Sequence, residues 1–366
     1  MSRKQKQFRS SHEVEVLSDH FANASSIFTT SPLYRTLCPF VARERPILEL
    51  LTERREGQQA SFLLFGAVHY LLLLGVKHPL SSFYPSLVGE TALEPGGVGP
   101  VFRRFVRDYR DDLLPIIRTR LIQTNVVKRV IGLRYALAAI APRCKQPMHL
   151  IEIGSSAGIH LLFDQYKYVI GKHLYGDEDS PVCVQAEWRA DQEPLNLNKL
   201  PLIASRVGVD LHPVNVRDER ERLWLRALVW PEDKHKAALL EAALRMLSSE
   251  RPRLIEGDAL DVCPQLAADL PFGEPRVVFH AATRMHVPEE RRHLFDSAID
   301  AVGHSGPLFH VWQEPTWAPH HDSVADPRGA IEFHGPGDEK PVSLVLVDGH
   351  LEWLALPDGG RAAGSP

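Results

Sequence analysis

The residues with the clearest chemical potential form one glycine-rich segment near the middle of the chain. It reads Leu-Ile-Glu-Ile-Gly-Ser-Ser-Ala-Gly, with Glu152 inside a short apolar run and Gly154 and Gly158 four positions apart. Glycine lets a turn approach a ligand closely, and the small residues Ser155 and Ser156 leave room beside it. Because the dinucleotide pattern G-x-G-x-x-G is absent, the segment favours a different nucleoside ligand. The alternative is a tight strand-to-helix turn that binds nothing.

A second carboxylate lies where a nucleoside ribose would need one. Residues 207–211 read as a strand that ends at Asp210 and Leu211, and an acidic residue at such a strand end accepts hydrogen bonds from ribose hydroxyls. Asp210 follows Glu152 by far more than the roughly 20 residues of a compact βαβ unit. We therefore expect an insertion at about 167–205, with Glu187 as the competing ribose ligand.

Two further segments are candidate parts of the same site. Asp258 and Ala259 follow the next expected strand, in a segment that resembles a loop contacting the adenine amino group of a nucleoside ligand; a common Gly-Asp turn is the alternative. His280 ends the fourth expected strand and is a candidate to face the cofactor or the methyl acceptor. A strand-end histidine with an ordinary structural hydrogen bond is the alternative there.

These residues need a parallel sheet to position them, and the sequence predicts one. Apolar residues recur at helical spacing from His12 to about Ala141, which predicts an all-α domain over residues 1–146. Short apolar runs then alternate with helical stretches, as in an α/β fold. The predicted strands are residues 148–153, 206–211, 253–255, 276–280 and 308–312, and the predicted helices are residues 234–247 and 289–299.

The end of the chain predicts an antiparallel hairpin. Strands at 342–347 and 351–356 flank Asp348-Gly349, a strong turn pair. The α/β domain is therefore expected over residues 147–357, and the tail over residues 358–366 is expected to be disordered.

The glycine-rich segment resembles motif I of the class I S-adenosylmethionine-dependent methyltransferases, whose Rossmann-like sheet ends in such a hairpin. The whole chain resembles a bacterial methyltransferase-like family, known as a domain of unknown function, with an N-terminal helical cap. The segments that carry this resemblance are His78-Pro79-Leu80, Phe83-Tyr84-Pro85-Ser86, Thr119-Arg120, Gln123-Thr124-Asn125, 152–168, 206–213 and Val229-Trp230-Pro231. Two positions depart from the family pattern: Val126 replaces glutamate and His160 replaces asparagine.

The resemblance implies S-adenosylmethionine as the cofactor, with the helical half closing over it as a lid. Tyr84, His78 and Asn125 are then candidate catalytic residues, and Gln123 a candidate cofactor ligand, with Tyr70 also able to face the sulfonium. Each of them could instead pack in a core or cap a turn.

Two reactions in bacterial small-molecule, natural-product metabolism fit this expectation. One is methyl transfer to a small molecule. The other is cyclisation of S-adenosylmethionine itself to azetidine-2-carboxylate with release of methylthioadenosine, for which an apolar pocket or a base such as His78 or Tyr84 is needed to keep the amine neutral. A catalytically inert binding or scaffold protein is the alternative outside enzymology. The amide and nucleobase N-methyltransferase pattern Asp/Asn-Pro-Pro-Tyr/Phe is absent.

A metal enzyme is a weaker alternative. His310, His320, His321 and Asp322 lie close together in sequence, but adjacent histidines seldom bind one ion together. The sequence therefore predicts no metal site.

Composition narrows the class of protein. The formal net charge of −4 disfavours nucleic acid as a partner. The four cysteines stand far apart, the first residues lack the apolar core of a signal peptide, and the run 62–76 is too short to span a bilayer. We therefore expect a cytoplasmic enzyme that acts on a small molecule without membrane contact, its oligomeric state left open.

Overall fold

The computed structural model of the protein describes residues 3–315 and 328–357. The chain forms two compact units. The helical unit comprises Met1–Thr124 and Arg217–Ala238, and the sheet unit comprises Asn125–Val216 and Leu239–Pro366. The predicted boundary after residue 146 therefore differs from the observed division. The reason lies in packing, because residues 125–146 cover strands of the sheet and a later segment returns to the helical core.

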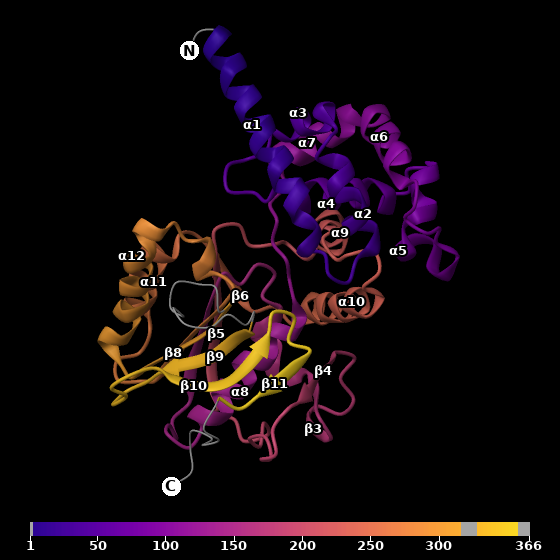
Figure 1. Ribbon diagram of the computed structural model, residues 1–366. Helices are drawn as coiled ribbons and strands as arrows, with labels where there is room; N and C mark the ends of the chain where they lie inside the picture. The colour runs from indigo at the N-terminus through magenta and orange to yellow at the C-terminus, as the bar shows by residue number, and fades with distance from the viewer. Residues whose placement is uncertain (1–2, 316–327, 358–366) are drawn as a thin grey trace. The chain divides into compact units, whose positions relative to one another are not determined.

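The helical unit contains the short helices that the apolar spacing predicts (Figure 1). Their bounds are α1 Arg3–Asn23, α2 Pro32–Val41, α3 Arg45–Leu51, α4 Ala60–Leu73, α5 Pro85–Val88, α6 Val98–Asp108, α7 Arg110–Thr119 and α9 Glu219–Ala227. Helix α10, Lys234–Ser249, begins in this unit and ends in the sheet unit.

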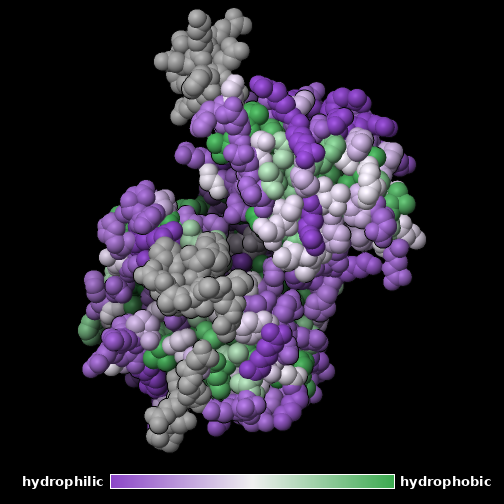
Figure 2. Space-filling model, viewed as in Figure 1, coloured by the Kyte–Doolittle hydropathy of each residue, from purple (hydrophilic) through white to green (hydrophobic). Residues whose placement is uncertain are grey.

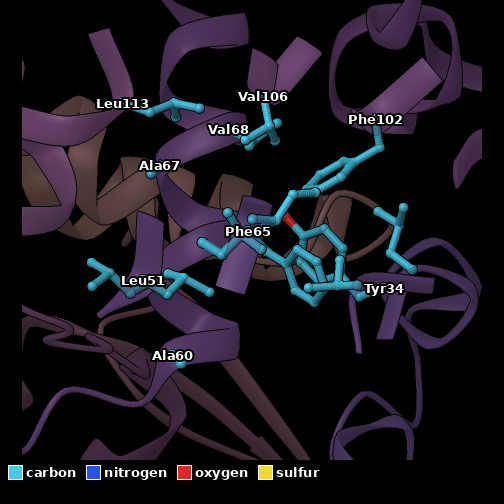
Figure 3. Packing of buried hydrophobic residues seen from close by; sticks show 14 of the residues in the cluster. Tyr34, Leu51, Ala60, Phe65, Ala67, Val68, Phe102, Val106 and Leu113 are labelled. Carbon is cyan, nitrogen blue, oxygen red and sulfur yellow. The ribbon is translucent and has the colours of Figure 1, made fainter. Parts of the chain in front are cut away.

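Helix α4 forms the centre of the helical core. Nearly all of its residues are buried, and Phe65 stacks on Tyr34 with 4.4 Å between the ring centroids (Figure 3). His69 interrupts this apolar helix, but its two nitrogens contact the Ala227 carbonyl at 3.0 Å and the Ser86 hydroxyl at 2.8 Å. Burial lowers the pKa of His69 to about 4, so the ring is neutral at physiological pH. The prediction of a buried helix over this run is confirmed.

The visible face of both units is mostly hydrophilic, with apolar residues scattered among polar ones (Figure 2). Helix α4, the most apolar, has 14 residues, and none of the helices in the described part of the chain has the length and apolar content needed to cross a membrane.

The sheet unit is built on one mixed, mostly parallel sheet (Figure 1). Its strand order is β3-β2-β4-β11-β10-β9-β8-β7-β1-β5-β6. The strands are β1 Met148–Ile153, β2 Lys167–Ile170, β3 His173–Gly176, β4 Cys183–Trp188, β5 Ile203–Asp210, β6 Arg253–Glu256, β7 Arg276–Ala281, β8 Leu308–Pro315, β9 Arg328–His334, β10 Val342–Asp348 and β11 Trp353–Ala355. Strand β1 is the middle strand of the parallel run β8-β7-β1-β5-β6 and is buried along its whole length.

Helices pack on both faces of the sheet. Helices α11 (Ala259–Asp269) and α12 (Arg292–Val302) share an apolar cluster with β1, β5 and β7. Helix α8 (Val130–Ile140) packs on β8, β9 and β10. Its Gly132 approaches Gln313 so closely that an added Cβ would lie 2.4 Å from the amide oxygen. The predicted α/β architecture is confirmed.

Most of the predicted strands are present, and the differences have physical causes. The five predicted parallel strands are present as β1, β5, β6, β7 and β8. The insertion supplies β2, β3 and β4 at the far edge of the sheet, and the terminal hairpin is formed by β10 and β11. The sequence analysis did not predict β9, which pairs antiparallel with both β8 and β10. Helical spacing through Leu161, Leu162 and Phe163 predicts a helix after Gly158, but the chain there forms a short, kinked 3-10 helix, η5 (Ile159–Gln165). The predicted disordered tail lies outside the described residues.

We expect Arg134 to be essential for the stability of the sheet unit. Its buried guanidinium donates to the Leu197 and Phe163 carbonyls and lies 4.5 Å from the Tyr168 ring centroid, so it joins α8, η5 and the insertion. Arg134→Ala leaves buried carbonyls without donors and should lower the free energy of unfolding by about 3 kcal/mol, measured by urea denaturation. Arg189→Ala, on an exposed ion pair, should change it by less than about 1 kcal/mol. Equal effects of both variants would contradict this role.

Candidate functional site

The strand order predicts a ligand site at the carboxyl ends of β1 and β7. From β1 the chain proceeds to β5 and β6 on one side, and then crosses to β7 and β8 on the other. Ligands of open α/β sheets bind where the order of the strands reverses, outside the carboxyl ends. In this sheet that point lies between Ile153, the last residue of β1, and its register partner His280 on β7.

The turn after β1 has a strained backbone. Gly154 and Gly158 have φ values of +74° and +79°, and Ser156, which carries a side chain, has φ +49°. A Cβ on Gly154 would lie 2.3 Å from the Thr283 hydroxyl oxygen, which belongs to the loop after β7. Ala282 in that loop also has positive φ, +50°. Strained residues on both sides of one crevice are typical of functional sites, because the surrounding structure must hold them in place.

Two polar side chains hold this turn in place. Asp210, at the end of β5, accepts hydrogen bonds from the backbone N–H groups of Ser156 and His212, both at 2.8 Å. Asn125 donates to the Ser156 hydroxyl at 2.7 Å and accepts from the Ala157 N–H at 3.4 Å. The structure thus brings together Asp210, Asn125 and the glycine-rich turn. Glu187, the competing ribose ligand, lies on β4, which pairs with β2 and β11 rather than with β1.

The acidic residue of β1 shares a proton with a neighbouring histidine. Glu152 Oε1 lies 2.7 Å from His160 Nδ1, and His160 Nε2 lies 3.0 Å from the Val126 carbonyl oxygen. A carbonyl oxygen cannot donate, so Nε2 carries a hydrogen and the bond to Glu152 holds another. Burial raises the pKa of Glu152, and His160 opposes that rise. The pair is therefore neutral overall. Val126 and His160, the two positions that depart from the family pattern, contact each other here.

A second buried carboxylate lies at the end of β8. Glu314 Oε1 accepts from His280 Nδ1 at 2.8 Å and from the backbone N–H groups of Thr283 and Arg284, each at 3.0 Å. Burial alone would raise the pKa of Glu314, but these donors, His280 first among them, hold it below its ordinary value. His280 Nε2 lies 3.0 Å from His310 Nε2. Because Glu314 takes the hydrogen on Nδ1, His310 donates in the neutral form of this chain of groups.

Several buried polar atoms in this region have no hydrogen-bond partner. They are Glu152 Oε2, Ser155 Oγ, Glu314 Oε2 and Gln313 Oε1. Leaving a buried polar atom unsatisfied costs about 1–3 kcal/mol, and more for a charged group. All four residues lie within two positions of the carboxyl end of β1 or β8, which places the unsatisfied groups at this end of the sheet. A ligand with donor groups is the partner that such atoms need.

Three predicted site residues belong to the helical unit. Tyr84 is fully buried in the helical core, with an unpartnered hydroxyl and a pKa that burial raises well above its ordinary range. His78 caps a 3-10 helix by accepting from the Leu80 N–H at 3.1 Å, and its Nε2 is unpartnered. Gln123 is half-buried in the segment after α7. Tyr70 is also buried in this core.

Other predicted residues have structural contacts near the crevice. Asp258 caps α11 by accepting from the Leu260 N–H at 3.0 Å and pairs with Arg291 at 3.1 Å. Ala259 is the first residue of that helix and is buried. Leu211 is 60% exposed beside Asp210, an unusual position for a leucine without a partner surface.

The metal alternative receives no support from the described residues. Within residues 3–315 and 328–357, no group of three or more His, Cys, Asp or Glu side chains could hold an ion. His310 instead belongs to the hydrogen-bonded chain with His280. The neighbouring candidates His320, His321 and Asp322 lie outside the described residues.

Sequence reasoning missed three members of the site: His160 as the partner of Glu152, Thr283 as the residue against Gly154, and Glu314. A signal for Glu314 was present, because an acidic residue at a strand end is the same pattern that identified Asp210. It was overlooked because the predicted strand stopped at Trp312, whereas β8 continues to Pro315.

A cavity of about 550 Å³ lies at the opposite edge of the sheet. Its lining includes Phe272 and Gly306, near the amino ends of β7 and β8, and His334 at the end of β9. This cavity lies near the amino ends of the parallel strands, whereas the glycine-rich turn follows the carboxyl end of β1, and none of the predicted site residues lines it. We therefore assign the candidate site to the carboxyl edge.

Gly154→Ala tests the close approach between the turn and Thr283. In the variant, alanine must adopt a left-handed φ and its Cβ overlaps the Thr283 side chain. The overlap should lower the free energy of unfolding by about 1–3 kcal/mol beyond the loss that the left-handed φ causes by itself. Gly273→Ala is the matched control, since its φ of +80° is similar and no atom lies within 4 Å of the added Cβ. Chemical denaturation of both variants measures the difference. Equal losses would show that Thr283 does not restrict the turn.

Glu152→Gln tests the proton shared with His160. A carboxyl whose pKa is raised on folding loses stabilising energy as the pH rises from its unfolded value of about 4.5 through its folded value. The amide can still donate to Nδ1 but does not titrate. The free energy of unfolding of the variant, relative to the wild type, should therefore increase as the pH rises above that unfolded value. Glu187→Gln, on an exposed carboxyl, should show no such trend, and a flat difference for Glu152→Gln would contradict the shared proton.

Comparison with known proteins gives a family for the chain. No curated protein sequence matches it. A family model described as "Uncharacterized protein conserved in bacteria (DUF2332)" matches residues 19–355, which covers both units and every candidate site residue. The chain therefore belongs to this bacterial family.

Proposed function

We propose that the sheet unit binds S-adenosylmethionine at the carboxyl ends of β1 and β5, and that the chain is an enzyme dependent on this molecule. The observation that carries the proposal is the contact between Asp210 and the glycine-rich turn, in which one carboxylate holds the Ser156 N–H at the point where the strand order reverses. A strand-end carboxylate beside a glycine turn is the arrangement that binds a nucleoside in α/β sheets.

The residues present fit the different parts of this molecule. A carboxylate at the end of a strand, as Asp210 is, accepts hydrogen bonds from ribose hydroxyls in nucleoside sites of α/β sheets. Leu211 offers an exposed apolar surface, and the loop with Asp258 lies beside it because the Gly257 N–H donates to the Asp210 carbonyl at 2.9 Å. Both support an adenine site next to the ribose. The unsatisfied Glu152 Oε2 and Ser155 Oγ support the amino-acid end at the turn itself.

S-adenosylmethionine supplies an electrophilic methyl group on a positively charged sulfur. The protein must then orient an acceptor in line with that methyl group, exclude water, and remove a proton from the acceptor where necessary. The buried chain of Glu314, His280 and His310 holds its protons in a defined order and could stabilise charge at the crevice. We accordingly propose methyl transfer to a small molecule as the reaction.

Binding of S-adenosylhomocysteine, the stable product form of the cofactor, tests the proposal by titration calorimetry. We expect saturable binding to the wild type and a loss of affinity on the order of 10-fold or more in Asp210→Ala, because the ribose hydroxyls lose a charged acceptor. Glu187→Ala should bind as the wild type does. The absence of saturable binding to folded wild-type protein would overturn the proposal.

Turnover of S-adenosylmethionine by the protein alone separates the alternatives once binding is found. Mass spectrometry of the nucleoside products would show methylthioadenosine together with azetidine-2-carboxylate if the chain cyclises the molecule. Binding without turnover directs the search to methyl acceptors. Binding without turnover in any acceptor screen is the result expected of an inert binding protein.

A further inference from the structure

A serine, a histidine and a glutamate form a hydrogen-bonded row at the amino ends of three neighbouring parallel strands. Ser205 Oγ lies 2.7 Å from His149 Nδ1, and His149 Nε2 lies 2.6 Å from Glu274 Oε2. Ser205 is near the start of β5, His149 is near the start of β1, and Glu274 lies two residues before β7. All three belong to the sheet unit, at the edge opposite to the candidate site.

The pairing of the strands explains why these side chains meet. Strand β1 lies between β5 and β7, and His149 is the register partner of Ser205 on one side and of Arg276 on the other. The fully buried Arg276 donates to the backbone carbonyls of Glu274 at 2.9 Å and of Pro271 at 3.0 Å. Arg276 therefore fixes the loop that carries the glutamate beside the histidine.

The positions of the protons in this row suit a nucleophile. A carboxylate can only accept, so His149 Nε2 donates its hydrogen to Glu274. In the neutral ring Nδ1 is then bare, and it accepts the hydrogen of the Ser205 hydroxyl. His149 is 6% exposed, whereas Ser205 is half-buried. A serine bonded to a histidine, which a third group orients, is the arrangement that activates a hydroxyl for attack on a carbonyl carbon.

Two serine–histidine pairs of the helical unit show what the glutamate adds. Ser86 Oγ lies 2.8 Å from His69 Nε2, but the other nitrogen of that ring contacts only a backbone carbonyl, that of Ala227. Ser61 lies 3.0 Å from His20 Nε2 and is fully buried. A carboxylate stabilises the charged imidazole that forms when the serine proton is removed, and a neutral carbonyl does so less strongly. The row in the sheet unit supplies this charge.

The cavity at the amino edge borders on this row. Phe272 and Gly273, which directly precede Glu274 in the chain, line it, and its volume of about 550 Å³ is that of a small-molecule site. Pro307 and Leu308 are also part of the lining. Together with Phe272 they offer apolar surface to a substrate whose reacting group lies at the row.

We propose that Ser205, His149 and Glu274 form a second catalytic site, which hydrolyses carboxylic esters of apolar acyl groups. The inference does not depend on S-adenosylmethionine binding. Ser205 Oγ attacks the ester carbonyl carbon while His149 takes the hydroxyl proton. That proton passes to the leaving alcohol as its C–O bond breaks, and an acyl-serine remains. Water then attacks the acyl-serine with His149 as the base, which releases the carboxylic acid and restores Ser205.

A fluorophosphonate probe tests the nucleophile in the full-length protein. The serine oxygen forms a bond to phosphorus, fluoride leaves, and His149 takes the proton. We expect an adduct at Ser205, located by peptide mass spectrometry, and its loss in Ser205→Ala. Ser86→Ala is the matched control, because Ser86 contacts a histidine without a carboxylate, and it should be labelled as the wild type is. No adduct at Ser205 in folded wild-type protein would overturn the inference.

Hydrolysis of p-nitrophenyl butyrate and acetate tests the roles of the base and of its partner. Ser205→Ala and His149→Gln should each lower kcat/KM by about 100-fold or more. The Glu274 side chain is 47% exposed, so Glu274→Gln should fold. It keeps an acceptor for His149 but loses the charge, and should lower kcat by about 10-fold or more with little change in KM. The wild type should prefer the butyrate.

The opposite results would contradict the proposed site. Rates that stay unchanged in folded Ser205→Ala or Glu274→Gln would show that the row is structural. A rise in KM with unchanged kcat in Glu274→Gln would show that the carboxylate does not assist the reaction. A preference for the acetate would contradict an apolar acyl site at the cavity.

Discussion

Glu152 is a carboxyl group buried inside β1, so its charge must be neutralised within the protein. The organisation of the candidate site depends on how this is done. Glu152 lies in β1, which is buried throughout, and His160 provides its partner. The histidine ring is fixed on its other side by the Val126 carbonyl. One bonded chain therefore joins the central strand, the 3-10 helix after the turn and the segment that enters the sheet unit. Asn125, next to Val126, then reaches the turn itself.

The same region combines residues in strained backbone conformations with carboxyl groups that have a hydrogen-bond partner on only one of their two oxygens. Ser156 and Ala282 hold positive φ values on the two sides of the crevice, at a cost of order 1–3 kcal/mol each. Glu152 and Glu314 each have one oxygen bonded and one oxygen unpartnered. A purely structural network would gain stability by completing these bonds within the protein. Preorganised groups that await a donor are what ligand binding requires, because the cost of orienting them is met during folding.

The residues that depart from the family pattern acquire a physical meaning in this setting. Val126 and His160 meet in a single hydrogen bond, and it uses the backbone of one and the side chain of the other. A histidine at position 160 can hold a proton beside Glu152, which an asparagine cannot do in the same way. The charge that the turn presents to a ligand is thereby set by this pair.

Local pattern in the sequence was enough to determine the elements, and the tertiary structure decided which of them meet. Apolar spacing and turn residues predicted the buried helix α4, the parallel strands, the insertion and the terminal hairpin, because these depend on neighbours within a few residues. Strand order is set by long-range pairing, so only the structure placed Asp210 rather than Glu187 beside β1 and enclosed Tyr84 in the helical core. The bond between Asn125 and Ser156, and the bond between His280 and Glu314, likewise follow from packing between segments far apart in the chain.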